Sequence, residues 1–307
     1  MNAIDILSMG EPMIEFNQTR PGAPDYLQGF GGDSSNLAIA AARSGARAAY
    51  LTRVGDDEFG HLFLKLWKQE SVDTRGVAID AQAYTGVYFV AHDRTGHRFS
   101  YLRAGSAASR MRPEELPLEL IRDARFVHAS GISMAISPGA ADSVLAAFDI
   151  ARAAGAKTSF DPNLRLKLWP LARARALIGA AVASADYFFP SIEDARALSG
   201  LDDADAILDW ALGLGAKTVF LKLGAEGVIA SDGARRERIA GLRVQAVDAT
   251  GAGDCFCGAA LARLAAGDSV AAAARYANAA AALASTGFGA VAPLPRPEDV
   301  FNLLRVP

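Results

Sequence analysis

Asp248-Ala249-Thr250-Gly251-Ala252-Gly253-Asp254 follows an apolar run and precedes residues 255–266 (CFCGAALARLAA), which are small and apolar at helical spacing. Two glycines and an alanine let the backbone approach a ligand closely, because no bulky side chain stands in the way. At a helix N-terminus the unpaired backbone N–H groups and the helix dipole favour an anion such as phosphate. This stretch therefore predicts a phosphate-binding turn that opens a helix.

Asp254 ends this turn, where phosphate would repel its carboxylate if binding were its only task. Its placement is explained if it accepts the proton of a hydroxyl group that attacks phosphorus. We therefore name Asp254 as the candidate general base and the N–H groups of Gly251, Ala252 and Gly253 as the candidate anion hole. The alternative is a glycine-rich turn in which Asp254 is an ordinary acidic residue of the first helical turn.

Composition restricts the class of protein. The chain has 307 residues, enough for one large α/β domain, with 51% hydrophobic and 21% charged residues as in soluble enzymes. Its formal net charge of −3 gives no electrostatic reason to expect nucleic acid or an anionic membrane as a partner. No run reaches the roughly 18 apolar residues that cross a bilayer, and no secretory signal precedes the first strand-like run, so we expect a cytoplasmic protein.

The two cysteines, Cys255 and Cys257, lie two residues apart on the predicted helix. This spacing suits neither a helical disulfide nor a zinc site, so we predict small core residues.

Strand-like and helix-like segments alternate along most of the chain. Residues 33–44 and 56–70 read as helices, and strand-like apolar runs occur at residues 4–7, 49–54, 126–129, 157–160, 187–189 and 218–221. This alternation predicts an α/β fold, a three-layer αβα core with a mostly parallel central sheet. Ligands in such folds gather at the carboxyl ends of the strands.

Two segments, about residues 12–30 and 84–107, break this rhythm because they contain strand-like pieces without a long helix. We predict that they form a small β-sheet lid on a single domain spanning residues 1–307. A lid that excludes water would protect ATP from hydrolysis during phosphoryl transfer. The alternative is a pair of plain surface hairpins.

Two distant signatures resemble the ribokinase-like (PfkB-type) carbohydrate kinases over essentially the whole chain. They are Gly31-Gly32-Asp33-Ser34-Ser35-Asn36-Leu37-Ala38 with Arg53-Val54-Gly55-Asp56-Asp57-Glu58-Phe59-Gly60, and the stretch from Val247 to Asp254. Within that family the chain is most similar to the 2-keto-3-deoxygluconate kinases. The features of that branch are Gly10-Glu11-Pro12, Thr85-Gly86-Val87-Tyr88, Tyr101-Leu102-Arg103-Ala104-Gly105-Ser106-Ala107 and Asp161-Pro162-Asn163-Leu164-Arg165.

The resemblance implies ATP-dependent phosphorylation of a primary hydroxyl group, converting 2-keto-3-deoxygluconate to its 6-phosphate. Magnesium accompanies ATP in such transfers. Other acceptors remain open, namely fructose, ribose, another hexose or a nucleoside, as does a non-catalytic sensor of nucleotide or sugar. A dinucleotide enzyme is disfavoured, because Gly10-Glu11-Pro12 stands where a G-x-G-x-x-G turn would follow the first strand.

The resemblance also implies the acceptor site. Its residues are Gly32, Asp33, Asn36, Tyr88, Tyr101, Arg103, Arg165 and Asp254. An arginine fork suits the carboxylate of a keto acid and has no such partner in a neutral sugar. Several alternatives stay open: Asp33 could cap the helix, both tyrosines could belong to the lid core, and both arginines could be solvated.

The expected nucleotide site consists of Asn163, Arg165, Ser191, Lys222, Gly224, Gly227, Gly251, Gly253 and Asn278. A monovalent cation such as K⁺ would be held by Asp248 and Thr250. The family often has an N-x-x-E motif associated with magnesium, and here Ser191-Ile192-Glu193-Asp194 takes its place, so Asp194 is expected to act on Mg²⁺ indirectly. Family members often pair through their lids, so we expect a homodimer or higher homo-oligomer.

Overall fold

Most strands of the central sheet are buried on both faces, which explains why they read as apolar runs. The computed structural model describes residues 4–93 and 96–305, and in these ranges nine strands pair in the order β13-β12-β11-β10-β9-β8-β1-β4-β5. Their bounds are β1 (Ile4–Met9), β4 (Ala48–Gly55), β5 (Asp73–Asp80), β8 (Ala124–Ser130), β9 (Lys157–Asp161), β10 (Tyr187–Phe188), β11 (Thr218–Lys222), β12 (Gly227–Ser231) and β13 (Arg236–Ala240).

The strands from β5 to β11 run parallel to their neighbours, whereas β12 and β13 continue the sheet antiparallel. The six apolar runs of the sequence all lie in this sheet, but β5, β12 and β13 were not predicted. Both β5 and β13 are edge strands: β13 (RERIA) is mostly charged, and the short apolar run of β5 at residues 77–79 stands between charged residues and is not buried.

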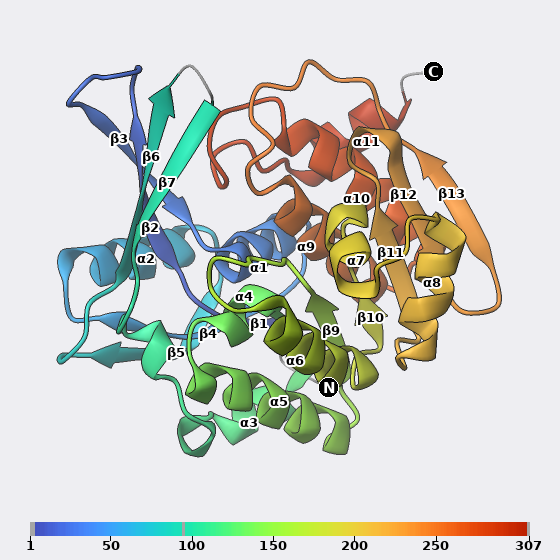
Figure 1. Ribbon diagram of the computed structural model, residues 1–307, viewed down its shortest axis with the longest axis horizontal. Coiled ribbons are helices and arrows are strands. Elements are labelled where there is room, and N and C mark those ends of the chain that lie inside the picture. The colour runs from blue at the N-terminus through green and yellow to red at the C-terminus, as the bar shows by residue number, and fades with distance from the viewer. Residues whose placement is uncertain (1–3, 94–95, 306–307) are drawn as a thin grey trace.

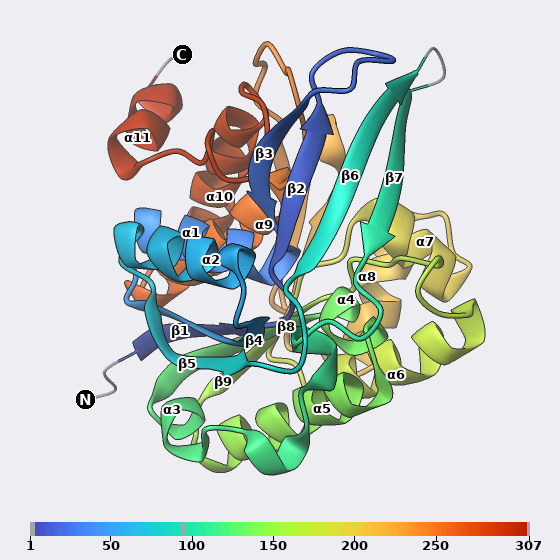
Figure 2. The same cartoon turned by 90° about the vertical axis from the view of Figure 1, so that its left-hand side faces the viewer.

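Helices cover both faces of the sheet, so the predicted three-layer αβα architecture is confirmed (Figure 1). Figure 2 shows the two helical layers, one above the sheet and one below it. The upper layer comprises α1 (Asp33–Arg43), α2 (Glu58–Gln69), α9 (Ala252–Ala265), α10 (Val270–Ala284) and α11 (Pro297–Arg305). The lower layer comprises α3 (Leu118–Arg122), α4 (Gly131–Ala135), α5 (Pro138–Ala153), α6 (Leu171–Ala183), α7 (Ile192–Ser199) and α8 (Ala204–Gly213). No helix in the described part of the chain is long and apolar enough to span a membrane.

A second sheet stands apart from the first, in the order β3-β2-β6-β7. Its strands are β2 (Met13–Gln18), β3 (Tyr26–Gly31), β6 (Gly86–Asp93) and β7 (Gly96–Leu102). One face packs on α2, where Phe30 meets the ring of Phe63, and the other carries Tyr88 and Tyr101. We call this sheet the lid. Its Leu27 side chain is 68% exposed, and pairing of two copies through the lid stays a prediction.

Helices α1 and α9 approach each other closely at Gly258. A Cβ atom there would lie 2.5 Å from the carbonyl oxygen of Leu37 and 2.9 Å from the Cβ atom of Ala40. Both neighbours belong to α1, and Cys255 and Cys257 are buried beside them as predicted. This contact brings the N-termini of the two helices to the same end of the sheet.

We predict that Gly258→Ala lowers the free energy of unfolding by about 1–3 kcal/mol, because the added methyl group overpacks the α1–α9 contact. Urea denaturation measures the change. Gly179→Ala in α6 is the matched control, because a Cβ atom at Gly179 meets nothing within 4 Å. That variant should gain about 0.5–1 kcal/mol from the better helix propensity of alanine. A Gly258→Ala protein at least as stable as the wild type would contradict the close packing.

Candidate active site

The predicted phosphate-binding turn forms the N-terminus of α9. Gly251 is its N-cap with a left-handed φ of 76°, and a Cβ atom there would lie 3.0 Å from Ala290, so glycine is required. Among the described residues no acceptor pairs with the N–H groups of Gly251 and Gly253. The N–H group of Ala252 instead donates to the carbonyl oxygen of Ala249 at 3.1 Å. Two of the three expected amides are therefore open to an anion.

Asp254 lies in the first turn of α9, and its Oδ2 atom accepts a hydrogen bond of 2.8 Å from Nδ2 of Asn36 on α1. Burial and, after it, the charge of Asp33 raise the pKa of Asp254, and the bond from Asn36 lowers it, with a net value of about 7. A carboxylate with a pKa near neutrality is a stronger base than an ordinary aspartate. The site thus contains a carboxyl group suited to take a proton at neutral pH.

Asp33 and Asn36 occupy the first turn of α1, next to Asp254. Each has a buried Oδ1 atom without a hydrogen-bond partner in the described structure. The alternative that Asp33 caps the helix is wrong, because Gly32 is the N-cap and α1 begins at Asp33 without a side-chain capping bond. Two unpartnered acceptors beside a base suit the hydroxyl donors of a sugar.

Gly32 makes this arrangement possible. Its φ is 101°, and a Cβ atom would overlap the carbonyl oxygen of Glu11 in the loop after β1. The start of α1 therefore rests directly on the segment that leads from the core into the lid.

The two lid tyrosines differ. Tyr88 is buried, and its hydroxyl group donates to the carboxylate of Glu15, so in this structure it belongs to the lid interior. Tyr101 is 41% exposed, with its ring centroid 5.9 Å from that of Tyr88. Only Tyr101 thus presents a large exposed surface to a ligand.

Arg103 forms a buried ion pair with Glu11, which also accepts a hydrogen bond of 2.5 Å from Ser106. Burial raises the pKa of Glu11, and the neighbouring charge of Arg103 opposes that rise. The Arg103 side chain is 10% exposed, and its Nε atom is buried without an acceptor among the described residues. Sequence reasoning missed the roles of Glu11 and Ser106. A charged residue directly after an apolar strand was the available signal.

Lys222, at the end of β11, lies beneath the N-terminus of α9. Its Nζ atom is 2.5 Å from Oδ2 of Asp161. A Cβ atom added to Gly253 would lie 3.5 Å from the same Nζ atom. Burial lowers the pKa of Lys222, but the charge of Asp161 helps to raise it above its usual value. A permanent positive charge thus stands beside the open amides. Sequence reasoning assigned no role to Asp161.

The loop after β9 holds two predicted residues, Asn163 and Arg165, and a third, Asp194 on α7, contacts it. Asn163 has a left-handed φ of 31°, and its Nδ2 atom donates to Oδ2 of Asp33 at 2.9 Å. Arg165 is exposed, and its Nη1 atom donates to the carbonyl oxygen of Leu164. Asp194 accepts from the N–H group of Leu164 at 3.2 Å, and burial followed by the charge of Asp161 raises its pKa. Asn163 is thus half-buried and bonded to Asp33, Asp194 of α7 holds the backbone of the loop, and Arg165 is exposed.

The other predicted nucleotide residues have local structural partners. Ser191 caps α7 by accepting from the N–H group of Asp194, and Asn278 donates to the carbonyl oxygen of Ala240 at 2.8 Å. Gly224, with a φ of 60°, begins the turn η3 (Gly224–Glu226) between β11 and β12, and Gly227, with a φ of 100°, is the first residue of β12. These groups lie around the β11–β13 edge.

The carboxylate of Asp248 accepts hydrogen bonds within the loop before α9 and from the segment after α10. Its Oδ1 atom accepts from the N–H and hydroxyl groups of Thr250, and its Oδ2 atom accepts from the N–H group of Gly289 at 3.0 Å. Within residues 4–93 and 96–305, no group of three or more His, Cys, Asp or Glu side chains is arranged to hold a metal ion.

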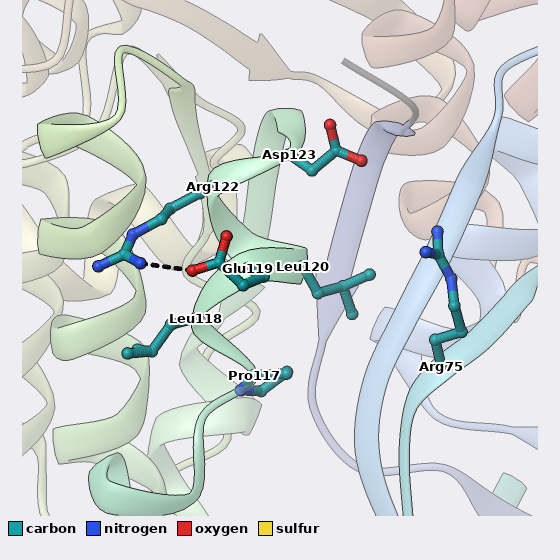
Figure 3. A pocket seen from close by; sticks show the side chains of 7 residues that line it. All are labelled: Arg75, Pro117, Leu118, Glu119, Leu120, Arg122 and Asp123. Atoms are coloured by element: carbon teal, nitrogen blue, oxygen red, sulfur yellow. Dashed lines mark hydrogen bonds and ion pairs between the residues drawn. The ribbon is translucent and has the colours of Figure 1, made fainter.

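A hollow of about 820 Å³ lies elsewhere, between β5 and α3 (Figure 3). It is lined by Arg75, Pro117, Leu118, Glu119, Leu120, Arg122 and Asp123. None of the predicted site residues lines it, so size alone does not identify the site.

Comparison with known proteins identifies the family of the chain. The chain matches the family model described as pfkB family carbohydrate kinase over residues 3–297. It is 35% identical to fructokinase-2 of Solanum habrochaites, over 98% of this chain and 96% of that one. It is also 35% identical to 2-dehydro-3-deoxygluconokinase of Thermoproteus tenax, over 98% and 94% of the two chains. Fructokinase with bound ATP from Xylella fastidiosa superposes with a TM-score of 0.90 at 28% identity, over 98% of each chain. The chain therefore belongs to the pfkB family of carbohydrate kinases.

Proposed function

We propose that this carbohydrate kinase transfers the γ-phosphoryl group of ATP to the primary hydroxyl group of a sugar acid, with 2-keto-3-deoxygluconate as the preferred acceptor. The observation that carries the proposed chemistry is the carboxyl group of Asp254, whose pKa burial raises to about 7, beside the open amides of α9. A base and an anion hole at one helix N-terminus are what hydroxyl attack on phosphorus requires.

In the proposed reaction Asp254 takes the proton as the acceptor oxygen bonds to the γ-phosphorus atom. The bond from that phosphorus to the bridging oxygen breaks, and ADP leaves. A positioned base contributes roughly 10²–10⁴-fold. The amides of Gly251 and Gly253 hold the equatorial oxygens, and loss of one such donor costs on the order of 10²–10³-fold in turnover. Lys222 adds positive charge beside the same oxygens.

Magnesium bound together with ATP would supply positive charge that offsets the charge developing on the phosphates. Asp194 offers a hard carboxylate oxygen of the kind Mg²⁺ prefers, and its N–H partner Leu164 fixes the orientation of the group. We propose that Asp194 supports the magnesium of the bound nucleotide. We also propose that a monovalent cation binds near Asp248 and Thr250, which hydrogen-bond to each other.

The acceptor assignment rests on Arg103. Its buried Nε atom lacks an acceptor, and the carboxylate of a sugar acid would supply one and form the paired bonds that a guanidinium group favours. The relative from Thermoproteus tenax carries the name of such a kinase, which supports this assignment.

Fructose is the second candidate. Glu11 already neutralises Arg103, and the unpartnered Oδ1 atoms of Asp33 and Asn36 accept hydroxyl groups from neutral sugars equally well. The relative from Solanum habrochaites is named for that reaction.

We predict that wild-type protein with Mg-ATP releases ADP fastest with 2-keto-3-deoxygluconate among the sugars of an acceptor panel. Arg103→Lys should raise KM for the sugar acid at least about tenfold and leave KM for fructose within about threefold. Lysine keeps a positive charge beside Glu11 but loses the planar fork of donors. Arg122→Lys, at an exposed ion pair remote from the site, is the control. A wild-type preference for fructose, or equal losses with both acceptors, would exclude the sugar acid assignment.

We predict that Asp254→Asn lowers kcat by about 10²–10⁴-fold while the affinities for ATP and sugar change by only severalfold, because the amide keeps its shape but accepts no proton. Stopped-flow ADP release and calorimetric titration measure the two effects. A nearly normal kcat would disprove the base assignment. A wild-type protein that binds both ligands but never releases ADP would instead be a sensor.

Asp254→Asn should also change how the free energy of unfolding depends on pH. A raised pKa means that the folded state disfavours ionised Asp254, so ionisation costs wild-type stability above about pH 7. Asp254→Asn should therefore be more stable than wild type at pH 8. The difference should shrink as the pH falls through 7 towards 4, where the wild-type group is protonated.

A further inference from the structure

We propose that Asn163 is a positioning residue for the acceptor sugar: its side-chain amide fixes the carboxylate of Asp33, which in turn receives an acceptor hydroxyl group. This inference rests on the proposed kinase function and adds a residue to the acceptor side of the site. The sequence placed Asn163 among the nucleotide-binding residues instead.

The geometry around Asp33 separates its two oxygens. The Oδ2 atom accepts 2.9 Å from Nδ2 of Asn163, whereas the Oδ1 atom is buried and has no partner in the described structure. With one oxygen held, the carboxylate cannot rotate freely, and its free oxygen keeps one direction. A fixed acceptor loses less conformational freedom when a hydroxyl group binds to it.

Asn163 is itself held in a rare conformation. Its φ of 31° lies in the left-handed region, which asparagine tolerates better than most residues. Its N–H group donates to Oδ1 of Asp161 at 3.0 Å, which fixes the backbone from below. Backbone strain of this kind persists where the surrounding structure determines it and is concentrated at functional sites.

These bonds join the two halves of the site. Asp161 holds Lys222 with Oδ2 and the Asn163 backbone with Oδ1, and the Asn163 side chain holds Asp33. The chain of bonds therefore runs from the phosphate end to the acceptor end. Within it the side chain of Asn163 serves the acceptor end, so its removal should affect the sugar rather than ATP.

The test uses Asn163→Asp and Asn163→Gly with Mg-ATP and, in turn, 2-keto-3-deoxygluconate and fructose. Aspartate keeps the size and the left-handed conformation but turns the donor into a carboxylate that Asp33 repels. We expect KM for the better acceptor to rise at least about tenfold, with KM for Mg-ATP within about twofold, because a hydrogen bond to a charged group is lost. Glycine fits the φ of 31° without strain, so Asn163→Gly removes only the side-chain amide. We expect KM for the acceptor to rise by about three- to tenfold in this variant, with KM for Mg-ATP again nearly unchanged.

Ser71→Gly is the matched control, because Ser71 also has a left-handed φ, 59°, in the exposed turn after α2. It should leave both KM values unchanged. A rise in KM for Mg-ATP with an unchanged acceptor KM in the Asn163 variants would overturn the proposal and restore the nucleotide role. Equal rises in KM for the acceptor and KM for Mg-ATP, together with a lowered Tm, would also overturn the proposal and indicate a purely structural role for Asn163.

Failure of the Asn163 proposal can be distinguished from failure of the proposed kinase reaction. If wild-type protein transfers phosphate to no sugar, the proposed reaction fails. Calorimetric titration with the same two sugars then decides the role of Asn163: weaker sugar binding by Asn163→Asp supports it, and unchanged binding overturns it.

Discussion

The close contact between α1 and α9 places two acidic side chains, Asp33 and Asp254, in one partly buried space. The bond from Asn36 to Asp254 crosses between the helices, and the close approach at Gly258 sets their separation. In a region of low dielectric, the charge of the neighbouring Asp33 disfavours ionisation of Asp254. Burial and this repulsion together explain why the pKa of Asp254 rises to about 7. The same packing that stabilises the fold thus tunes the base.

Positive charge balances the other end of the site. The N-terminus of α9 offers its open amides, and Lys222 stands beneath them in an ion pair with Asp161. An anion bound there would meet both the helix dipole and the ammonium group. The candidate site therefore has a basic end at Lys222 and an acidic end at Asp33 and Asp254, and in the proposed function these ends receive phosphate and hydroxyl groups.

Much of the fold follows from local patterns in the sequence. Apolar runs such as β8 and β11 alternate with helical segments, and this was sufficient to predict the layered sheet. β13 escaped prediction because its residues RERIA are mostly polar at a sheet edge. The turn at Gly251 was predictable because a glycine requirement is a property of the local backbone. The second sheet was predictable as two segments without helical spacing.

The partners of the site residues were not predictable in this way. Arg103 meets Glu11, and Lys222 meets Asp161, across separations of 92 and 61 residues that no spacing rule covers. The capping alternative for Asp33 was a reasonable local interpretation, yet Gly32 takes the N-cap position because the backbone must pass Glu11 closely. Long-range contacts, rather than local propensity, decide which polar atoms remain free for a ligand.

The most direct test of the account is the pH dependence of kcat/KM for the wild-type protein with its best acceptor and Mg-ATP. If Asp254 is the base, the rate constant should be level above about pH 7 and fall tenfold per unit below it, because only the ionised carboxylate accepts a proton. A profile that stays level down to pH 5, with the protein still folded, would contradict the assignment of Asp254 as a buried base with a raised pKa.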